Sequence, residues 1–225
     1  MAVNIEAYQS IKKELDSKKV TLVAVSKTKP VSDIQTLYDL GQRDFGENYV
    51  QELVEKQKQL PHDIRWHFIG HLQRNKVKEI AAFVHLIHGV DSLRLLVEIN
   101  KQALKSGRTI PVLLQMHIAR EETKFGLDEN ELKEIIKNLS GLNNVSVKGL
   151  MGMASFTDDK EVAQKEFRYL KLLYDGWLIT YHLSLNTYLL PLTTLSMGMS
   201  NDYRIAIEEG SNMVRIGSLL FGARS

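Results

Sequence analysis

The chain has 225 residues, of which 29 are Lys or Arg and 27 are Asp or Glu, so its net charge is +2. This balance argues against a dedicated nucleic-acid or membrane surface, and the absence of cysteine excludes disulfides and thiolate metal sites. No stretch resembles a signal peptide or has the length of a membrane span. We therefore expect a soluble cytoplasmic protein with a single domain over residues 1–225.

Apolar runs that are typical of strands alternate with helical repeats along the whole chain. The first run, VTLVAV at residues 20–25, is apolar and β-branched without alternation, as in a strand buried on both faces of a parallel sheet. Further strands are expected at residues 43–48, 64–69, 83–89, 110–118, 145–153, 193–196 and 212–216. Helices are expected at residues 4–17, 30–40, 49–60, 77–81, 92–106, 132–139, 160–174, 203–209 and 219–222.

This alternation predicts an α/β fold. Eight strands, each followed by a helix of crossover length, match a single (β/α)₈ TIM barrel with an additional N-terminal helix. The rival is an open, doubly wound sheet, which normally needs fewer strands, so we favour the barrel.

Lys27 stands two residues after the first predicted strand. The carboxyl ends of the strands are where α/β folds bind ligands, and a lysine there has its stem against apolar neighbours and its amine at the rim. Burial disfavours the ammonium form, and a neutral amine can attack a carbonyl to form a Schiff base. The alternative is a solvated lysine that opens a loop.

The last two strands carry the residue types of a phosphate site. Ser196 and Ser200 flank Gly198, which would let backbone amides turn toward an anion, and Gly217 precedes the final helix. Two ordinary glycine turns are the alternative.

Arg215 lies in the eighth strand, next to the first strand if the barrel closes. In a closed barrel its side chain would point inward. The alternative is a strand-end arginine that pairs with Glu208 or Glu209. A lysine amine and a phosphate site on neighbouring strands would together suit pyridoxal 5'-phosphate (PLP).

Eight motifs in one order extend this interpretation over almost the whole chain. They are AVSKTKP, FGENYVQE, WHFIGHLQRNK, VDS, ETKFG, KGLMGMA, LSMGMSNDYRIAIEEGS and VRIGSLLFG. Together they resemble the pyridoxal-phosphate homeostasis protein family, whose barrel is similar to that of alanine racemase. The segment at residues 174–191 departs from the family by being more apolar and aromatic. It is either an unusual helix–strand connection or a cover for the outer barrel surface.

The resemblance implies which residues hold the cofactor. Lys27 would carry PLP as a Schiff base, Arg215 would face the pyridine nitrogen, and Asn48 would lie beside the ring. The resemblance places three residues at the phosphate, namely Ser196, Ser200 and Gly217.

Two histidines stand four residues apart, at positions 67 and 71. On a helix this spacing would suggest a metal pair, but here they straddle a strand end with no acidic third ligand nearby, so we expect no metal. We expect His67 at the rim near the cofactor and His71 to be an ordinary polar cap.

Two functions from different classes remain open. The first is a monomeric carrier in vitamin B6 homeostasis, without catalytic residues, that binds PLP and delivers it to apo forms of PLP-dependent enzymes. The second is an amino-acid racemase-like enzyme on the same barrel, which would need an acid/base group on each face of the substrate carbon. We favour the carrier, because nothing in the chain extends beyond the barrel and an arginine at the pyridine nitrogen makes the ring a weak electron sink. A weaker third alternative is a sugar-phosphate enzyme that uses Lys27 for a Schiff base.

Overall fold

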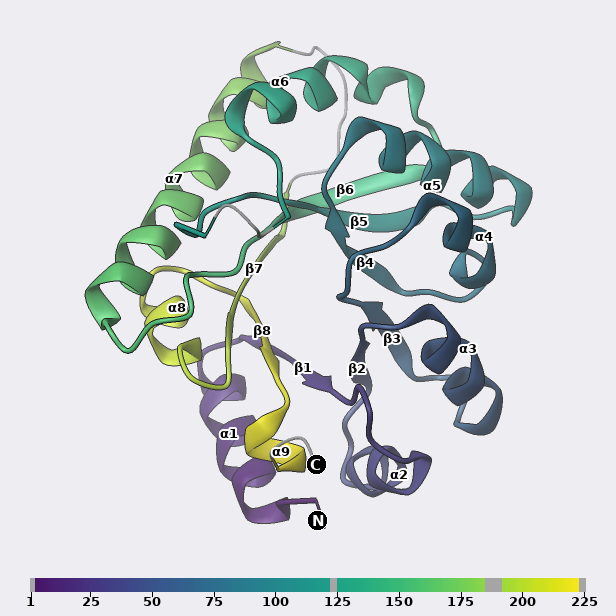
Figure 1. Cartoon of the computed structure of the whole chain (residues 1–225), viewed down its shortest axis with the longest axis vertical. Helices are drawn as coiled ribbons and strands as arrows, with labels where there is room; N and C mark the ends of the chain where they lie inside the picture. Colours follow the sequence, from purple (N-terminus) through teal and green to yellow (C-terminus); the bar gives the residue numbers. More distant parts are fainter. Residues whose placement is uncertain (1–2, 122–124, 185–191, 223–225) are drawn as a thin grey trace.

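The computed structural model describes residues 3–121, 125–184 and 192–222. Within these residues eight parallel strands form a closed barrel in sequence order, and β8 pairs with β1 (Figure 1). The predicted (β/α)₈ barrel with an N-terminal helix is therefore confirmed. The strands are β1 (Thr21–Val25), β2 (Asp44–Glu47), β3 (Arg65–Phe68), β4 (Leu86–Val90), β5 (Ile110–Gln115), β6 (Val145–Met151), β7 (Thr194–Met199) and β8 (Met213–Ile216).

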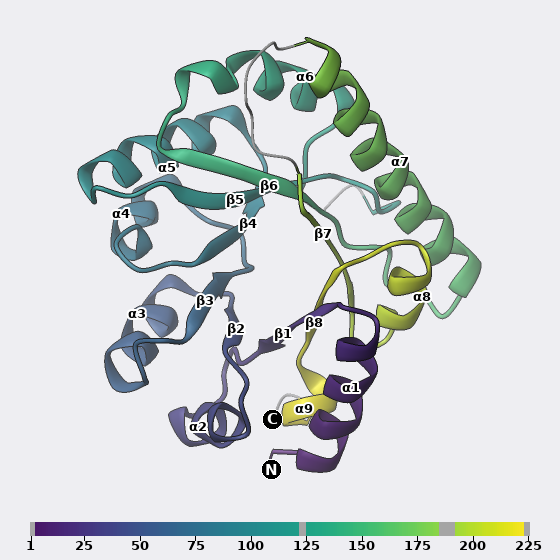
Figure 2. The same ribbon diagram turned by 180° about the vertical axis from the view of Figure 1, so that it is seen from behind.

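Helices surround the barrel, as Figures 1 and 2 show from opposite sides. They are α1 (Ile5–Ser17), α2 (Val31–Asp39), α3 (Val50–Gln59), α4 (Val77–Ile80), α5 (Leu93–Lys105), α6 (Glu129–Asn138), α7 (Lys160–Ser184), α8 (Tyr203–Glu208) and α9 (Ser218–Phe221), with short 3₁₀ turns η1 (Arg74–Lys76) and η2 (Leu139–Gly141). Among the described residues, none of these helices has both the length and the apolar character to cross a bilayer.

Strand β1 shows why a run without alternation forms a barrel strand. Leu22 and Ala24 belong to the large core between the strands and the helices, whereas Val23 belongs to a second apolar cluster inside the barrel. Both faces are thus buried, as parallel barrel strands require. Arg215 on β8 is paired in register with Val23, so the last strand brings its arginine beside the first.

The N-terminal helix packs where the barrel closes. Tyr8, Ile11 and Leu15 recur at helical spacing and are buried, and the amide of Asn4 donates a 2.8 Å hydrogen bond to the carbonyl of Leu220 just beyond β8. Helix α1 therefore lies beside α9 and covers the junction of β8 and β1 (Figure 2).

Several predicted boundaries are wrong, including the start of β4 and the end of β5. Strand β7 continues to Met199 instead of ending at Ser196, and helix α7 continues to Ser184 instead of ending near Tyr174. The helix continues because Tyr174 and Trp177 extend the buried stripe that includes Leu170 and pack on the core. Helix therefore occupies residues 174–184 of the unusual segment, and residues 185–191 lie outside the described residues.

Candidate functional site

A cavity of about 600 Å³ opens where the strands end, within the range of small-molecule sites. It lies at the carboxyl ends of strands from both halves of the barrel, which is where TIM barrels bind ligands. Five of the seven predicted site residues line it, namely Lys27, Asn48, Ser200, Arg215 and Gly217. The structure thus brings together side chains from the first, second, seventh and eighth strand ends.

Lys27 lies just after β1, in a tight turn. Ser26 before it is fully buried, and Thr28 after it has a φ of +64°, in the left-handed region that non-glycine residues rarely adopt. Lys27 itself is half-buried and lines the cavity. The turn must be held by its surroundings for a threonine to keep this conformation.

A buried ion-pair cluster on α3 and β2 holds both neighbours of that lysine. The Lys56 ammonium donates hydrogen bonds to the Ser26 carbonyl (2.8 Å) and to the carboxylates of Glu47 and Glu52 (2.7 Å each). Glu52 accepts a 2.6 Å hydrogen bond from the Thr28 amide, and Glu47 accepts one of 2.6 Å from the Ser26 hydroxyl. We call Glu47, Glu52 and Lys56 the β1 clamp.

Glu47 is the most deeply buried member of the β1 clamp. Its side chain is fully buried, and burial raises its pKa to about 7 although Lys56 and Ser26 lower it. Its Oε2 atom has no hydrogen-bond partner among the described residues. The clamp therefore changes its charge near neutral pH.

Asn48 follows β2 and enters the cavity wall. Its Oδ1 atom is buried and lacks a hydrogen-bond partner among the described residues, which is costly unless a ligand or water supplies a donor. Gly70 packs directly on the Asn48 backbone, because a Cβ atom at position 70 would lie 2.2 Å from the Asn48 carbonyl oxygen. Asn48 is thus fixed in place with an unused polar atom.

Arg215 lies at the base of the cavity and is almost completely buried. Its Nη1 atom donates hydrogen bonds to the carbonyl (2.9 Å) and the hydroxyl (2.6 Å) of Ser196, and its Nη2 atom donates one to the Gly152 carbonyl (3.0 Å). Burial lowers its pKa to about 10, so the guanidinium stays charged at neutral pH. Glu209 pairs with Arg168 at 2.9 Å instead, so the inward interpretation of Arg215 is confirmed.

Gly198 within β7 and Gly217 after β8 have different roles. The Gly217 amide donates a 3.3 Å hydrogen bond to the Ser200 hydroxyl, which joins the two loops at the cavity. Gly198 has a φ of +94° within β7, and a Cβ there would lie 2.6 Å from the Cβ of Ala206. Gly198 therefore allows α8 to approach the strand. The sequence suggested a turn at Gly198 with amides toward an anion, but this residue lies within strand β7.

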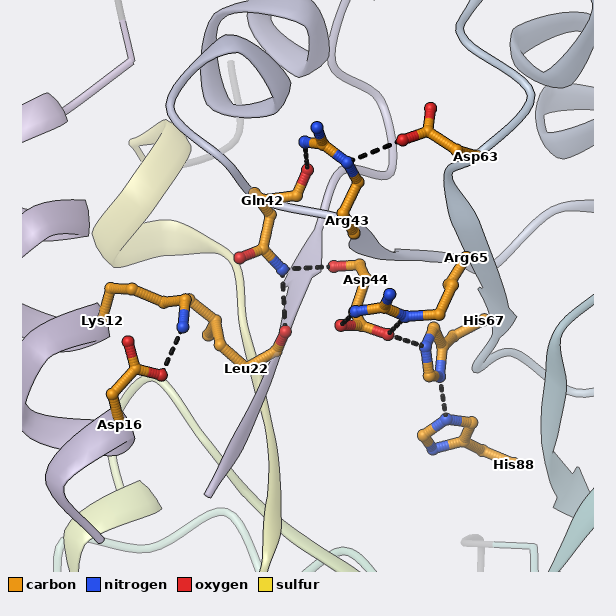
Figure 3. A network of polar contacts seen from close by, with 10 residues as sticks. All are labelled: Lys12, Asp16, Leu22, Gln42, Arg43, Asp44, Asp63, Arg65, His67 and His88. Atoms are coloured by element: carbon orange, nitrogen blue, oxygen red, sulfur yellow. Dashed lines mark hydrogen bonds and ion pairs between the residues drawn. The ribbon is translucent and has the colours of Figure 1, made fainter. Parts of the chain in front are cut away.

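Ser196 and His67 lie outside the residues that line the cavity. Figure 3 shows His67 between His88 and Asp44 in the barrel interior: its Nδ1 is 2.9 Å from His88 Nε2, and its Nε2 is 3.0 Å from Asp44 Oδ1. Ser196 Oγ contacts Arg215 and lies 3.3 Å from His88 Nδ1. Both residues are thus placed beneath the cavity.

Three residues at the amino end of the barrel lie close enough to hold a metal ion, but an arginine already binds one of them. Asp44, His67 and His85 place one ligand atom each within 4.8 Å of one another. Arg65, however, binds both oxygens of the Asp44 carboxylate at 2.7 and 2.5 Å (Figure 3). His71 lies apart from this group and bonds Asp91 at 3.0 Å.

The family model described as alanine racemase, N-terminal domain, matches residues 4–225 of the chain. The chain belongs to this family.

Relatives within the family share a common name. A pyridoxal phosphate homeostasis protein of Aquifex aeolicus is 42% identical over 204 residues, which cover 90% of this chain and 86% of that protein. The pyridoxal phosphate homeostasis protein of Escherichia coli K12 is 39% identical over 210 residues, with 91% and 86% covered. The predicted resemblance is therefore confirmed.

Solved structures separate closer from more distant members. PipY of Synechococcus elongatus PCC7942, a COG0325 family member solved with PLP bound, superposes with a TM-score of 0.86 at 34% identity and covers 96% of this chain and 99% of that chain. Alanine racemase of Bartonella henselae gives a TM-score of 0.72 at 17% identity and covers 99% of this chain but 60% of that chain. The racemase shares the fold alone.

Sequence reasoning missed the buried partners of the cavity residues. Lys56 was hidden among the polar residues of an amphipathic helix, although its spacing of four from Glu52 was a signal for an ion pair. His88 stands in a strand with no motif of its own. A buried polar residue within an apolar strand is the signal that could have identified His88 in this family member.

Proposed function

We propose that the protein binds PLP in this cavity and acts in PLP homeostasis. The observation that carries the proposal is that one cavity is lined by Lys27, the charged Arg215 and Asn48, whose Oδ1 lacks a hydrogen-bond partner among the described residues. Support comes from PipY, which has been solved with PLP bound and shares 34% of its sequence, and from relatives named pyridoxal phosphate homeostasis proteins.

The residues of the cavity fit distinct parts of the cofactor. PLP supplies an aldehyde that condenses with a primary amine. Lys27 Nζ would attack this aldehyde carbon, forming a carbon–nitrogen double bond and releasing water. Arg215 would face the pyridine nitrogen and Asn48 would lie beside the ring, while Ser200 and Gly217 would hold the phosphate through a hydroxyl and a backbone amide.

Arg215 favours a carrier over an enzyme. A permanently charged guanidinium disfavours protonation of the pyridine nitrogen, so the ring withdraws electrons weakly and stabilises carbanions poorly. We propose a monomeric, single-domain carrier of residues 1–225 that hands PLP to apo enzymes. The cysteine-free sequence suits the reducing cytoplasm.

Borohydride trapping tests the lysine. The protein is incubated with PLP, reduced with borohydride and digested, and the modified peptide is identified by mass spectrometry. We expect the adduct on Lys27 in the wild type and in Lys29→Ala, whose replaced lysine is also on the cavity wall. Unchanged labelling of Lys27→Ala would show that another residue carries the cofactor.

A panel of L-amino acids tests the racemase-like alternative, which the shared alanine racemase fold keeps open. The PLP-loaded protein is incubated with each amino acid, and chirality and keto-acid release are followed. We expect no sustained turnover. Many turnovers per protein molecule would assign the chain to the enzymes instead of the carriers.

A further inference from the structure

A chain of hydrogen bonds crosses the barrel interior from Arg215 to Asp44. Arg215 Nη1 lies 2.6 Å from Ser196 Oγ, which lies 3.3 Å from His88 Nδ1. His88 Nε2 lies 2.9 Å from His67 Nδ1, and His67 Nε2 lies 3.0 Å from Asp44 Oδ1. Figure 3 shows the last three members of this chain, which come from strands β4, β3 and β2.

With a neutral His67 ring, the donors of this chain all point toward Asp44. Burial opposes ionisation of Asp44, but its bonds to Arg65 and His67 outweigh burial and hold its pKa well below the usual range, so its carboxylate only accepts. His67 Nε2 must then carry the proton it donates, and in the neutral ring the bare Nδ1 accepts from His88 Nε2–H. His88 Nδ1 in turn accepts the hydroxyl proton of Ser196, which leaves the Ser196 oxygen free to accept from the guanidinium.

Burial makes this arrangement costly to break. Ser196 and His88 are fully buried, and His67, Arg215 and Asp44 are at most 9% exposed. Burial also lowers the pKa of His88 well below its usual value, which keeps that ring neutral. A break in the chain would leave buried donors or acceptors unpaired, since water has little access to them.

We propose that this chain fixes the guanidinium of Arg215 at the base of the cavity, which makes Ser196, His88 and His67 positioning residues for it. The consequence for PLP rests on the proposed function. Asp44 at the far end of the barrel orients the two rings, and the Ser196 hydroxyl presents its oxygen to Arg215 as a result. His67 and Ser196 thereby act on the cavity without lining it.

Nitrogen-15 NMR of the full-length protein without PLP tests the chain itself. Long-range proton–nitrogen spectra of the histidine rings should show His67 and His88 as neutral Nε2–H tautomers. The Arg215 Nη protons, assigned by their loss in Arg215→Lys, should give separate signals because rotation is restricted. A His88 ring protonated on Nδ1, or a freely rotating guanidinium in the wild type, would overturn the proposal.

Variants of His88 test its effect on Arg215. His88→Leu should merge the Arg215 Nη signals, whereas His88→Asn should partly retain their separation, because its amide oxygen can still accept from Ser196. The matched control is His85→Gln, which replaces a ring that lies 5.4 Å from His67 but is not a member of the chain. Separate Nη signals in folded His88→Leu would overturn the positioning role.

PLP titration gives the second readout. We expect His88→Leu to bind PLP about tenfold more weakly, with a changed visible circular dichroism of the bound cofactor, and His85→Gln to bind like the wild type. Wild-type affinity and dichroism in His88→Leu would contradict the inference. If the wild type did not bind PLP, the proposed function would be wrong, while the NMR spectra would still decide whether the chain positions Arg215.

Discussion

The β1 clamp makes a pH-dependent prediction about Lys56→Met. The substitution keeps the apolar stem but removes the ammonium that bonds Ser26, Glu47 and Glu52. Glu52 is partly exposed and can be solvated, whereas Glu47 is fully buried. Removing one partner of a buried pair costs about 3–5 kcal/mol when the other stays charged, so the outcome depends on the proton of Glu47.

The magnitude follows from the raised pKa of Glu47. In the wild type the pKa of Glu47 is about 7, compared with about 4.5 in the unfolded chain. The stabilisation by Glu47 is therefore complete below pH 4.5 and falls as the pH rises to about 7. Lys56 lowers this pKa, so in Lys56→Met the pKa is higher and the loss continues above pH 7. Each pH unit above 7 adds about 1.4 kcal/mol to the destabilisation caused by Lys56→Met. This destabilisation should therefore be about 2 kcal/mol larger at pH 8.5 than at pH 6.

Urea unfolding at pH 6 and pH 8.5 measures this difference. The destabilisation of Lys56→Met relative to the wild type should be larger at pH 8.5. As a control, Glu47→Gln/Lys56→Met is compared with Glu47→Gln, and this pair should show the same difference at both pH values, since the titrating carboxyl is gone. Equal destabilisation by the single substitution at both pH values would refute the reasoning.

Three further substitutions probe other parts of the barrel. Gly149→Ala should lower the free energy of unfolding by about 3 kcal/mol in urea titrations, because position 149 has a φ of +155° and a Cβ there would lie 1.7 Å from the Thr194 carbonyl oxygen. An unchanged urea midpoint would contradict this prediction. Leu15→Ala should cost about 2–5 kcal/mol, because this side chain of α1 is fully buried against the barrel, while the exposed Leu104→Ala should cost far less in the same assay. Arg215→Lys should weaken PLP binding about tenfold in fluorescence titrations, because an ammonium cannot reproduce the planar guanidinium that donates to Ser196 and Gly152. Equal affinity of the two proteins would exclude a binding role for the guanidinium.

The barrel could be predicted because its strands are short apolar runs with clear breaks. Residues 20–25 and 110–118 have no alternation, and the structure buries both faces of these strands. The end of β7 could not be predicted, because Gly198 looks like a turn residue in the sequence. Only the close packing of Ala206 from α8 shows that the glycine is needed within a strand.

The cavity wall was easier to predict than its supports. Lys27 and Arg215 stand at or next to strand ends, and parallel strands bring their carboxyl ends to one rim, whereas Asn48 was implied only by the family resemblance. Ser196 and His88 are 108 residues apart, and no local pattern indicates that they meet. Such contacts depend on the strand register and the direction of each side chain in the interior, which the sequence does not express locally.

The pairing of β8 with β1 also dictates when the cavity can exist during synthesis. The lysine at position 27 leaves the ribosome long before the arginine at position 215. Because domains acquire their structure as units, a nascent chain that lacks the last strand has an open edge and no complete cavity. A ligand that needs both residues can therefore bind only after the eighth strand has joined the first.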